Sequence, residues 1–474
     1  MNFEAVIGLE IHIEMKTKSK MFSSAPVTFG DEPNTNVAPL DIAFPGAMPT
    51  INKQAVINAI RVCNALHMEI DNVITFDRKN YFYSDLAKGY QLTQHKRPIG
   101  KLGYVDIVCD GGSKRINIQR LHIEEDTCKQ IHQNGKTYLD FNRSGIPLLE
   151  IVTSPDISNG EQAMKVVEKI KSIVVFLNVS SGRMEEGSLR CDVNVSIRPI
   201  GSSKLNSKVE IKNISTTANI EKAIDYEIRR QEALLLSGNR IASETRRYDE
   251  KSKQTISMRE KIEDIDYKYF TDANLPPIKL SQNFIKEVIR TSPELPDAKL
   301  ERYKKLGLSE KTSQLLINKK ENCDFFDEVI SYGVNETIAA NWIIVDIQAI
   351  LNKEEISLKD IGISPSSLAE LIKFIEKGTI STPQARQVFD VMRKTNKDCE
   401  TIVRELRLTL ISNKEQLLDI IRSILDNNKQ LVLDYKNGKT RVISYIIKGV
   451  MDMTEGKANP KITSELIIQE MEKR

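Results

Sequence analysis

Hydrophobic and polar residues alternate along the segment GRMEEGSLRCDVNVS, which spans residues 182–196. Alternation with a period of two predicts a β-strand that buries one face. The apolar face would carry Leu189, Cys191, Val193, Val195 and Ile197. The opposite face would present a cation, a carboxylate, an amide and a hydroxyl group, from Arg190, Asp192, Asn194 and Ser196. Because side chains on one face of a strand lie only about 7 Å apart, this polar row is suited to the floor of a cleft.

Two other segments repeat this arrangement. In VIGLEIHIEM, residues 6–15, the apolar residues Leu9, Ile11, Ile13 and Met15 alternate with Glu10, His12 and Glu14. In RINIQRLHIEED, residues 115–126, the alternation changes phase near Arg120, as a β-bulge would produce, and the segment ends in His122, Glu124, Glu125 and Asp126. One such strand is most simply explained by a solvent-exposed polar face. Three strands that each carry carboxylates favour a shared site.

The same periodicities predict the fold class and the domains. Within residues 1–290, strand-like segments at 105–108, 138–142, 148–152 and 209–214 are interspersed with helical segments at 54–66, 160–176 and 218–236. Strands become scarce beyond residues 275–277, and after Arg407 the pattern predicts three helices, at 415–425, 439–454 and 461–473. We therefore expect an α+β protein with a mixed-sheet cradle domain at 1–290, an all-α helical domain at 291–406 and a small all-α tail domain at 407–474.

Composition and charge exclude some classes of protein. The 68 Lys and Arg residues nearly balance the 65 Asp and Glu residues, so any nucleic-acid surface must be local; the tail, with 12 basic and 9 acidic residues, hints at an anionic partner. The sequence predicts neither a signal peptide nor a membrane span, because it has no basic segment followed by an apolar stretch at its start and no 18-residue apolar run, so we expect no membrane partner. Six scattered cysteines without a CxxC pair are typical of reduced thiols in a cytoplasmic protein.

The candidate chemistry is that of a divalent cation and phosphate groups. Neighbouring carboxylates suit Mg²⁺, which prefers oxygen ligands, while the ring nitrogen of His12 is better tolerated by Mn²⁺. A single histidine on a strand is, however, more often structural. The segment FDRKNYFYSDLAKGYQLTQ, residues 76–94, adds Arg78, Lys79, Lys88 and three tyrosines, which together could hold a nucleotide or a single-stranded RNA end. An exposed tyrosine-rich loop is the alternative interpretation.

Motifs that would carry other chemistry are missing. NGKT at residues 437–440 resembles the end of a P-loop, but Leu433 stands where the first glycine belongs, so ATP would bind elsewhere. The chain contains no G-x-S-x-G elbow, no Ser-Ser-Gly-Gly run and no G-x-C-x-G motif. We therefore do not expect this chain to generate its own nucleophile.

The segments together resemble the GatB family, whose members work in tRNA-dependent glutamyl/aspartyl amidotransferases. The resemblance covers the whole chain and is carried, in order, by VIGLEIHIEM, KMFS, FDRKNYFY, LHIEED, PLLEIVTSPD, MEEGSLRCDVNVS, EIKN, ETRRYDE, MREK, DYKYF and GKANP. It implies a cradle domain with a kinase and transamidase site, then a helical domain, then a tail that contacts tRNA. The chain departs from the family pattern in two places: Ser84 replaces a frequent proline, and residues 270–274 replace a more acidic, proline-containing stretch.

The resemblance also implies a reaction and partners. Glutamate or aspartate wrongly attached to the tRNA for glutamine or asparagine would be activated by ATP to an acyl phosphate, and ammonia would then displace the phosphate, with Mg²⁺ neutralising charge. An amidase subunit would release the ammonia from glutamine, and a small subunit would bridge the two in a heterotrimer.

By the same resemblance we assign roles to residues of this chain. The candidate metal ligands and their neighbours are Glu10, His12, Glu124, Glu125, Glu150, Glu185 and Glu186. The candidate catalytic residues are Glu125, Glu186, Arg190 and Lys88. The candidates for binding ATP and the aminoacyl group are Lys79, Tyr81, Tyr83, Ser188, Asp192 and Asn194.

Two other functions stay open at this point. A non-catalytic tRNA-binding scaffold would use the carboxylates only for a structural ion, but would have no need of two Glu-Glu pairs beside cations suited to phosphate. An ATP-dependent carboxylate–amine ligase that acts on a free small molecule fits the site but leaves the tail without a role. Nor does the sequence distinguish glutamyl-tRNA from aspartyl-tRNA as the substrate.

Overall fold

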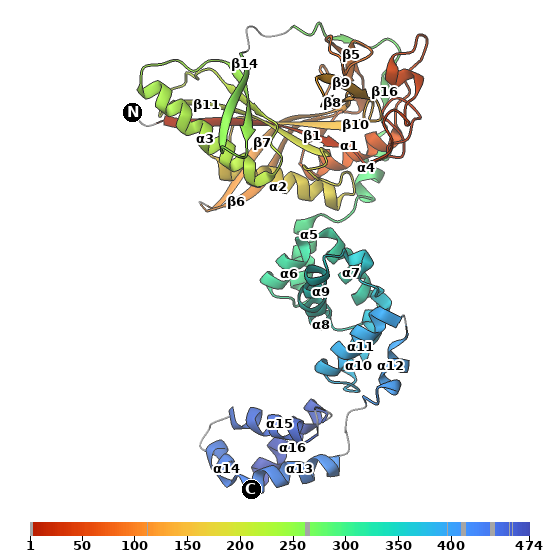
Figure 1. The fold of residues 1–474 in the computed structure, drawn as a ribbon, viewed down its shortest axis with the longest axis vertical. Helices are drawn as coiled ribbons and strands as arrows, with labels where there is room; N and C mark the ends of the chain where they lie inside the picture. The colour runs from red at the N-terminus through yellow and green to blue at the C-terminus, as the bar shows by residue number, and fades with distance from the viewer. Residues whose placement is uncertain are drawn as a thin grey trace. The chain divides into compact units, whose positions relative to one another are not determined.

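The computed structural model describes residues 3–110, 112–260, 266–395, 397–408, 414–436, 441–454, 456 and 458–474. The chain forms two compact units, residues 1–296 and 297–474 (Figure 1). The first unit combines strands and helices, whereas the described part of the second contains helices and no strand. The predicted α+β class is confirmed. The division of the helical part into two domains at residue 407 stays a prediction.

The first unit is built on a nine-stranded sheet in the order β14-β13-β12-β11-β1-β10-β7-β6-β2. Its strands are β1 (Phe3–Glu14), β2 (Glu69–Ile70), β6 (Gly100–Cys109), β7 (Gly112–Glu125), β10 (Pro147–Thr153), β11 (Leu189–Pro199), β12 (Val209–Lys212), β13 (Glu244–Asp249) and β14 (Gln254–Glu260). All neighbours are antiparallel except β12 and β13, so the sheet is mixed, as predicted. The three segments singled out by their alternation are the central strands β1 and β11 and the nearby β7.

One face of this sheet is apolar and packs against helices. Leu9, Ile11 and Ile13 of β1 are at most 1% exposed, because they lie under α1 (Lys53–Ala65), α2 (Gly160–Phe176) and α3 (Thr217–Leu236), which Figure 1 shows along this face. The side chains of Asn52, Asn159 and Thr216 cap the three helix N-termini, where backbone N–H groups would otherwise lack acceptors. These helices agree with the predicted ranges to within one residue at each end.

A bulge in β7 changes which residues face the core. The register between β7 and β10 shifts between Val152 and Thr153, whose partners are Arg120 and Ile118, so Gln119 is the extra residue. Before the bulge the core residues are Ile116 and Ile118, and after it they are Leu121 and Ile123. The phase change expected near Arg120 is thus confirmed, and it brings Arg120, His122 and Glu124 to the polar face.

Smaller strands lie on the polar side of the large sheet (Figure 1). A three-stranded sheet, here called the upper sheet, consists of β15 (Phe270–Thr271), β4 (Asp77–Asn80) and β5 (Tyr90–Thr93). The side chains of Gln91 and Gln94 fix it to β7, since Gln91 Nε2 donates to the Glu125 carbonyl at 2.8 Å and Gln94 Oε1 accepts from Ile123 N at 3.0 Å. Two pairs complete the unit: β8 (Lys129–Gln133) with β9 (Lys136–Asp140), and β3 (Val73–Ile74) with β16 (Ile278–Lys279). The helix α4 (Gln282–Arg290) packs on α1.

The second unit is helical. Its first part consists of α5 (Pro296–Lys305), α6 (Glu310–Ile317), α7 (Lys320–Ser331), α8 (Glu336–Asn341), η2 (Trp342–Ile347), α9 (Gln348–Glu354), α10 (Pro365–Glu376), α11 (Thr382–Thr395) and α12 (Cys399–Glu405). The one tryptophan of the chain, Trp342, is 3% exposed and packs against Phe389 with ring centroids 5.1 Å apart. This contact joins η2 to α11.

The end of the chain forms α13 (Lys414–Asn427), α14 (Lys429–Lys436), α15 (Arg441–Met453) and α16 (Pro460–Lys473), which enclose a core that includes Leu417, Ile421 and Ile446. Three of these helices match the predicted ones, and α14 was missed because it buries no residue and so lacks a clear apolar stripe. The P-loop-like residues 437–440 lie outside the described residues.

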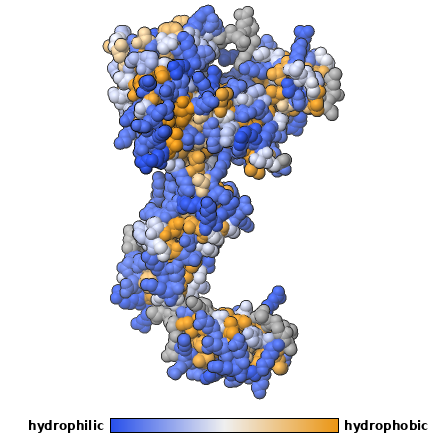
Figure 2. Space-filling view, turned by 180° about the vertical axis from the view of Figure 1, so that it is seen from behind, coloured by the Kyte–Doolittle hydropathy of each residue, from blue (hydrophilic) through white to orange (hydrophobic). Residues whose placement is uncertain are grey.

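The described surface offers no membrane-spanning element. No helix in these ranges is both long and apolar enough to cross a bilayer. On the face drawn in Figure 2, hydrophobic residues form separate patches among hydrophilic ones. A surface of this mixed kind is usual, because apolar atoms contribute a large share of the exposed area of most proteins.

Candidate functional site

Polar side chains form a row across four neighbouring strands of the large sheet. The strand register pairs Arg190 with His12, His12 with Glu150, and Glu150 with His122. Directly paired residues in a sheet point to the same face with their Cβ atoms about 5 Å apart. Glu124, two residues beyond His122 on β7, joins the same face. The predicted association of carboxylates and histidines from separate strands is therefore present in the fold.

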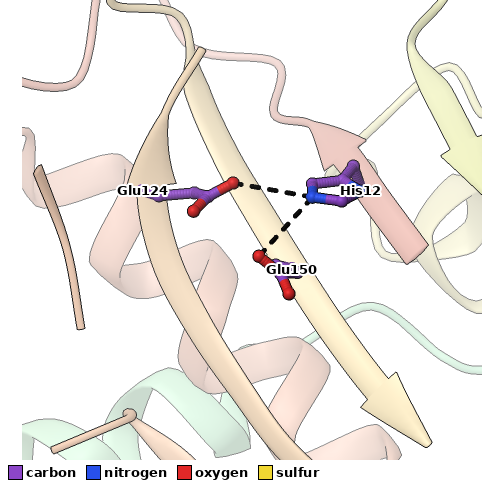
Figure 3. A group of neighbouring side chains, drawn as sticks. All are labelled: His12, Glu124 and Glu150. Carbon is purple, nitrogen blue, oxygen red and sulfur yellow. Dashed lines mark ion pairs between the residues drawn. The ribbon is translucent and has the colours of Figure 1, made fainter. Parts of the chain in front are cut away.

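His12, Glu124 and Glu150 converge at the centre of this row (Figure 3). His12 Nε2 lies 3.8 Å from Glu124 Oε1 and 3.5 Å from Glu150 Oε2. Both glutamates are nearly buried, at 2% and 9% exposure, whereas His12 is half-buried. Each of the three residues offers one potential ligand atom, and these atoms all lie within 4.8 Å of one another. Within the described residues, no other group of three or more His, Cys, Asp or Glu side chains comes this close together. We call His12, Glu124 and Glu150 the carboxylate–histidine cluster.

His122 supports the cluster from the side. Its Nε2 lies 3.0 Å from Glu150 Oε2 and 3.5 Å from Glu124 Oε2. Burial lowers the pKa of His122, but the two carboxylates outweigh burial and raise it to about 9. Burial alone would raise the pKa of Glu150. The positive charges of His122 and His12 outweigh burial and hold the pKa of Glu150 well below its usual value. The site thus keeps Glu150 ionised and able to serve as a ligand.

The cluster fits a divalent cation. It offers two carboxylates and one imidazole, the donor types that Mg²⁺ and Mn²⁺ accept. Ligand bonds of about 2.1 Å place neighbouring ligand atoms of one ion about 3 Å apart. The distances from His12 Nε2 to the carboxylates of Glu124 and Glu150, 3.8 and 3.5 Å, therefore need to shorten only slightly. Burial of His12 lowers its pKa, yet Glu150 and Glu124 raise it overall, so a cation at this point would replace a proton. His12, Glu124 and Glu150 are the residues that would hold the ion.

The residues predicted on β11 lie beside the cluster. Asn194 Nδ2 donates to Glu10 Oε1 at 3.0 Å, and Asp192 accepts from Lys212 Nζ at 2.5 Å. Arg190 donates to Asp126 at 2.6 Å. Glu10, Arg190, Asp192 and Asn194 therefore share one polar face with the cluster. Lys212 was not singled out from the sequence, although its place in the alternating segment VEIK, beside the polar face of β11, was a usable signal.

The upper sheet brings Lys79 and Tyr81 toward the cluster. Lys79 Nζ lies 5.0 Å from the ring centroid of Tyr267 and 5.9 Å from that of Tyr81. Burial lowers the pKa of Lys79, but the negative charge of Glu124 raises it overall, so the lysine stays cationic beside the carboxylates. Tyr267 and Tyr269 extend this aromatic wall. Both were quoted within the motif DYKYF but were not assigned a role.

Glu125 and Lys88 lie together, apart from the cluster. Because neighbouring residues on a strand point to opposite faces, Glu125 turns away from Glu124. Its carboxylate pairs with Lys88 Nζ and accepts a hydrogen bond from Leu92 N at 3.0 Å. Tyr83, 60% exposed, is near Lys88 in a shallow pocket of the loop after β4. The roles assigned to these three residues stay predictions, and the structure gives them different surroundings from His12.

Glu185, Glu186 and Ser188 occupy the turn before β11. Glu186 pairs with Arg183 at 2.6 Å, and Ser188 Oγ holds the turn closed by accepting from Arg183 N at 2.8 Å. All three residues line a cavity of about 1410 Å³ whose wall also includes Glu14. The structure thus places Glu185 and Glu186 at this cavity, whose lining does not include the carboxylate–histidine cluster. Their assignment as metal ligands stays a prediction.

Glu14 and Asp126 form an acidic pair that sequence reasoning did not assign. Burial and the nearby carboxylate of Asp126 raise the pKa of Glu14 to about 8. Burial raises the pKa of Asp126, but the guanidinium groups of Arg190 and Arg143 outweigh this effect and lower it. One proton is therefore held on Glu14 at neutral pH. The position of Glu14 on the polar face was visible in the sequence, but its partners depend on the fold.

Comparison with protein families identifies the type of domain that carries this site. Residues 5–286 match the family described as the GatB/GatE catalytic domain, and residues 324–471 match the family described as the GatB domain. The first match contains the whole carboxylate–histidine cluster and the upper sheet. The fold and the site therefore lie within a catalytic domain of known type.

Full-length relatives extend the match. The B subunit of the aspartyl/glutamyl-tRNA(Asn/Gln) amidotransferase of Mycoplasma mycoides is 45% identical over 475 residues, which cover 100% of this chain and 99% of the relative. The protein of the same name from Bacillus velezensis is 45% identical over 476 residues, with 100% of both chains covered. This chain belongs to the GatB family, that of the B subunits of aspartyl/glutamyl-tRNA(Asn/Gln) amidotransferases.

Proposed function

We propose that this chain is the kinase and transamidase subunit of an amidotransferase that converts Glu-tRNA(Gln), Asp-tRNA(Asn) or both to the corresponding amide. The observation that carries the proposal is the buried carboxylate–histidine cluster beside Lys79, within a chain similar along its whole length to GatB proteins. A site of this composition suits the handling of phosphate groups and of a cation that accompanies them.

The chemistry needs an activated acyl group, since a carboxylate is a poor electrophile. The side-chain carboxylate oxygen of the aminoacyl group attacks the γ-phosphorus of ATP, so that an acyl phosphate forms and ADP leaves. Ammonia then attacks the carbonyl carbon, the bond to the phosphate oxygen breaks, and amide and inorganic phosphate are released. A bound Mg²⁺, or Mn²⁺, would neutralise charge on the transferred phosphoryl group.

The protein groups have separable tasks in this scheme. Lys79 supplies positive charge beside the cluster and Lys212 beside Asp192, and burial between strands limits the access of water to the cluster. His122 holds Glu150 in place through its 3.0 Å contact, so that the cluster is preorganised before substrate binds. Asn194 and Asp192 lie next to Glu10 and are suited to orienting the aminoacyl group.

The ammonia is expected to come from partners. The chain contains no amidase-like Ser-Ser-Gly-Gly run and no glutaminase-type cysteine motif, and its six cysteines are free thiols, five of them buried. An amidase subunit would release ammonia from glutamine, and a small bridging subunit would complete a heterotrimer. The tail helices α13–α16 would contact the tRNA, consistent with the excess of basic residues in that region.

The purified complex tests this proposal directly. It is given ATP, Mg²⁺, glutamine and either Glu-tRNA(Gln) or Asp-tRNA(Asn), and the amino acid released from the tRNA is identified while ADP is measured. We expect glutamine or asparagine on the tRNA, and ADP that forms only when misacylated tRNA is present. Amide formation without ATP consumption would exclude the acyl phosphate, and tRNA binding without any amide would favour a scaffold.

A further inference from the structure

Arg120 is a cation on the polar face that has no ion-pair partner among the described residues. It lies on β7 two residues before His122, a separation of about 7 Å along a strand. Other cations around the site are paired: Lys88 with Glu125, Arg190 with Asp126, Lys212 with Asp192 and Arg78 with Asp272. Within the described part of the chain, Arg120 and Lys79 have no carboxylate within ion-pair distance. Two cations are thus left available beside the carboxylate–histidine cluster.

The surroundings of Arg120 are unfavourable without a ligand. Its Nε is buried and has no hydrogen-bond partner among the described residues, although a buried donor without an acceptor is costly. The strand register also places Lys101 directly opposite Arg120, and like charges in that position repel one another, although Asp71 lies 4.0 Å from Lys101 Nζ and offsets part of this repulsion. An anion that accepts from the guanidinium group would remove both penalties.

A stacked aromatic pair lies near the two available cations. The rings of His95 and Tyr269 are parallel to within 7°, with centroids 3.8 Å apart. Burial lowers the pKa of His95, and the charges of Arg120 and Lys79 lower it further. Burial raises the pKa of Tyr269, against the same two charges. Both rings therefore lie within electrostatic reach of both cations. His95 is exposed, so this edge of the site is open to a ligand.

We propose that Arg120 and Lys79, beside the His95–Tyr269 pair, form a phosphate-binding subsite of the reaction centre. The ligand is a phosphate group of a nucleotide, either ATP or the 3′ end of the tRNA, since both present the same oxygen acceptors to a guanidinium group. This inference rests on the proposed function and adds Arg120, His95 and Tyr269 to it. The stacked rings offer a flat surface to the base that accompanies the phosphate.

The test compares two substitutions on one strand. Arg120→Gln removes the available cation, and Arg115→Gln removes a cation of β7 that is already paired with Asp106 and stacked on Tyr104. Each is prepared in the complete amidotransferase complex, and the Kd for ATP and the KM for misacylated tRNA are measured. We expect Arg120→Gln to weaken one of these by on the order of ten- to a hundredfold, as loss of a charge-assisted hydrogen bond does, and Arg115→Gln to change neither.

The two measurements identify the source of the phosphate. A raised Kd for ATP with an unchanged KM for tRNA assigns the subsite to the nucleotide, and the reverse assigns it to the RNA. If Arg120→Gln and Arg115→Gln have the same Kd for ATP and the same KM for misacylated tRNA, the inference is wrong. Should Arg120→Gln fail to fold, Arg120→Met, which keeps an unbranched apolar stem but no charge, takes its place, and an unchanged Kd and KM in that variant would also overturn the inference. A wild-type complex that binds ATP but forms no amide would instead refute the proposed function.

Discussion

At the scale of single residues, the site is organised by opposite charges in a buried setting. Glu150 stays ionised because His12 and His122 flank it, and Lys79 stays protonated because Glu124 is near. Each group would change its protonation state if it were buried alone. The same reasoning explains why Glu14 differs from Glu150: its nearest charged neighbour is another carboxylate, Asp126, so it retains its proton.

Glu14 should make stability depend on pH. The unfolded chain releases this proton near its usual pKa of 4.5, whereas the folded chain releases it near pH 8, so the folded state binds more protons between these values. Stability should therefore fall as the pH rises through that window. In Glu14→Gln, which keeps a hydrogen-bond donor toward Asp126, this contribution is absent.

Thermal unfolding of the two proteins from pH 5 to pH 8 measures the effect. The Tm of the wild type should decrease relative to that of Glu14→Gln across this range, so that the difference between the two curves changes steadily. Curves that stay parallel would show that Glu14 carries no raised pKa in the folded protein.

At the scale of elements, the sequence predicts the strands of the site better than their surroundings. Alternation in β1, β7 and β11 identified the polar face, and even the bulge near Arg120 was visible as a change of phase. The order of strands was not predictable, because nothing in the alternation of β1 indicates that β10 and β11 flank it. For this reason, the sequence indicated His12, Glu124 and Glu150 as candidate metal ligands. It could not show that these three lie together while Glu125, Glu185 and Glu186 do not join them.

The same limit applies outside the site. α14 buries no residue, so its pattern of apolar residues did not indicate a helix. Arg120 had no distinguishing feature in the sequence beyond its position at the bulge. Its lack of an ion-pair partner within the described ranges depends on how the strands assemble. The same holds for the approach of Lys79, His95 and Tyr269, which come from the upper sheet and the segments next to it.

Close packing of β6 against the segment after α1 yields a stability prediction. A Cβ atom at Gly103 would lie 2.4 Å from Met68 Cγ and 2.5 Å from the Leu66 carbonyl oxygen, so the backbone would have to move. Gly103→Ala should lower the free energy of unfolding by about 1–3 kcal/mol, the usual range for overpacking. Denaturant titration measures the change.

Gly8→Ala serves as the matched control for this prediction. Gly8 is also in a strand of the large sheet, but a Cβ atom there would meet nothing within 4 Å. Its free energy of unfolding should stay within about 0.5 kcal/mol of the wild type, as is usual for substitutions that touch nothing. Equal effects of the two substitutions would mean that the approach of β6 to Met68 is looser than the structure indicates.

At the scale of the whole molecule, the chain separates the chemistry from the region expected to contact tRNA. The cluster, the upper sheet and the cavity beside Glu14 all belong to residues 1–296. Helices α13–α16 enclose a core of their own, so the tail can be removed without exposing the core of the first unit. This separation makes binding and catalysis independently testable.

Deletion of residues 407–474 should act on tRNA binding alone. We expect the KM for misacylated tRNA to rise by on the order of tenfold and to depend less on salt, since phosphate contacts act through the release of counterions. The Kd for ATP should stay unchanged. Steady-state kinetics at two salt concentrations measures this, and an unchanged KM with an unchanged salt dependence would assign the tail another role.

In the proposed function, the carboxylate–histidine cluster supports the ATP-dependent activation that leads to the amide bond. The most direct test of this role supplies ammonium chloride, ATP, Mg²⁺ and misacylated tRNA to complexes that carry either the wild-type chain or Glu150→Gln, and measures amide formation on the tRNA. Free ammonia bypasses the glutaminase step, so the measurement isolates the chemistry of this chain. We predict a loss on the order of a hundredfold or more for Glu150→Gln, while the same complex still releases ammonia from glutamine at the wild-type rate. Ammonium-driven amidation by Glu150→Gln within about threefold of the wild type would contradict the account, since removal of a required transition-state contact lowers kcat by much more.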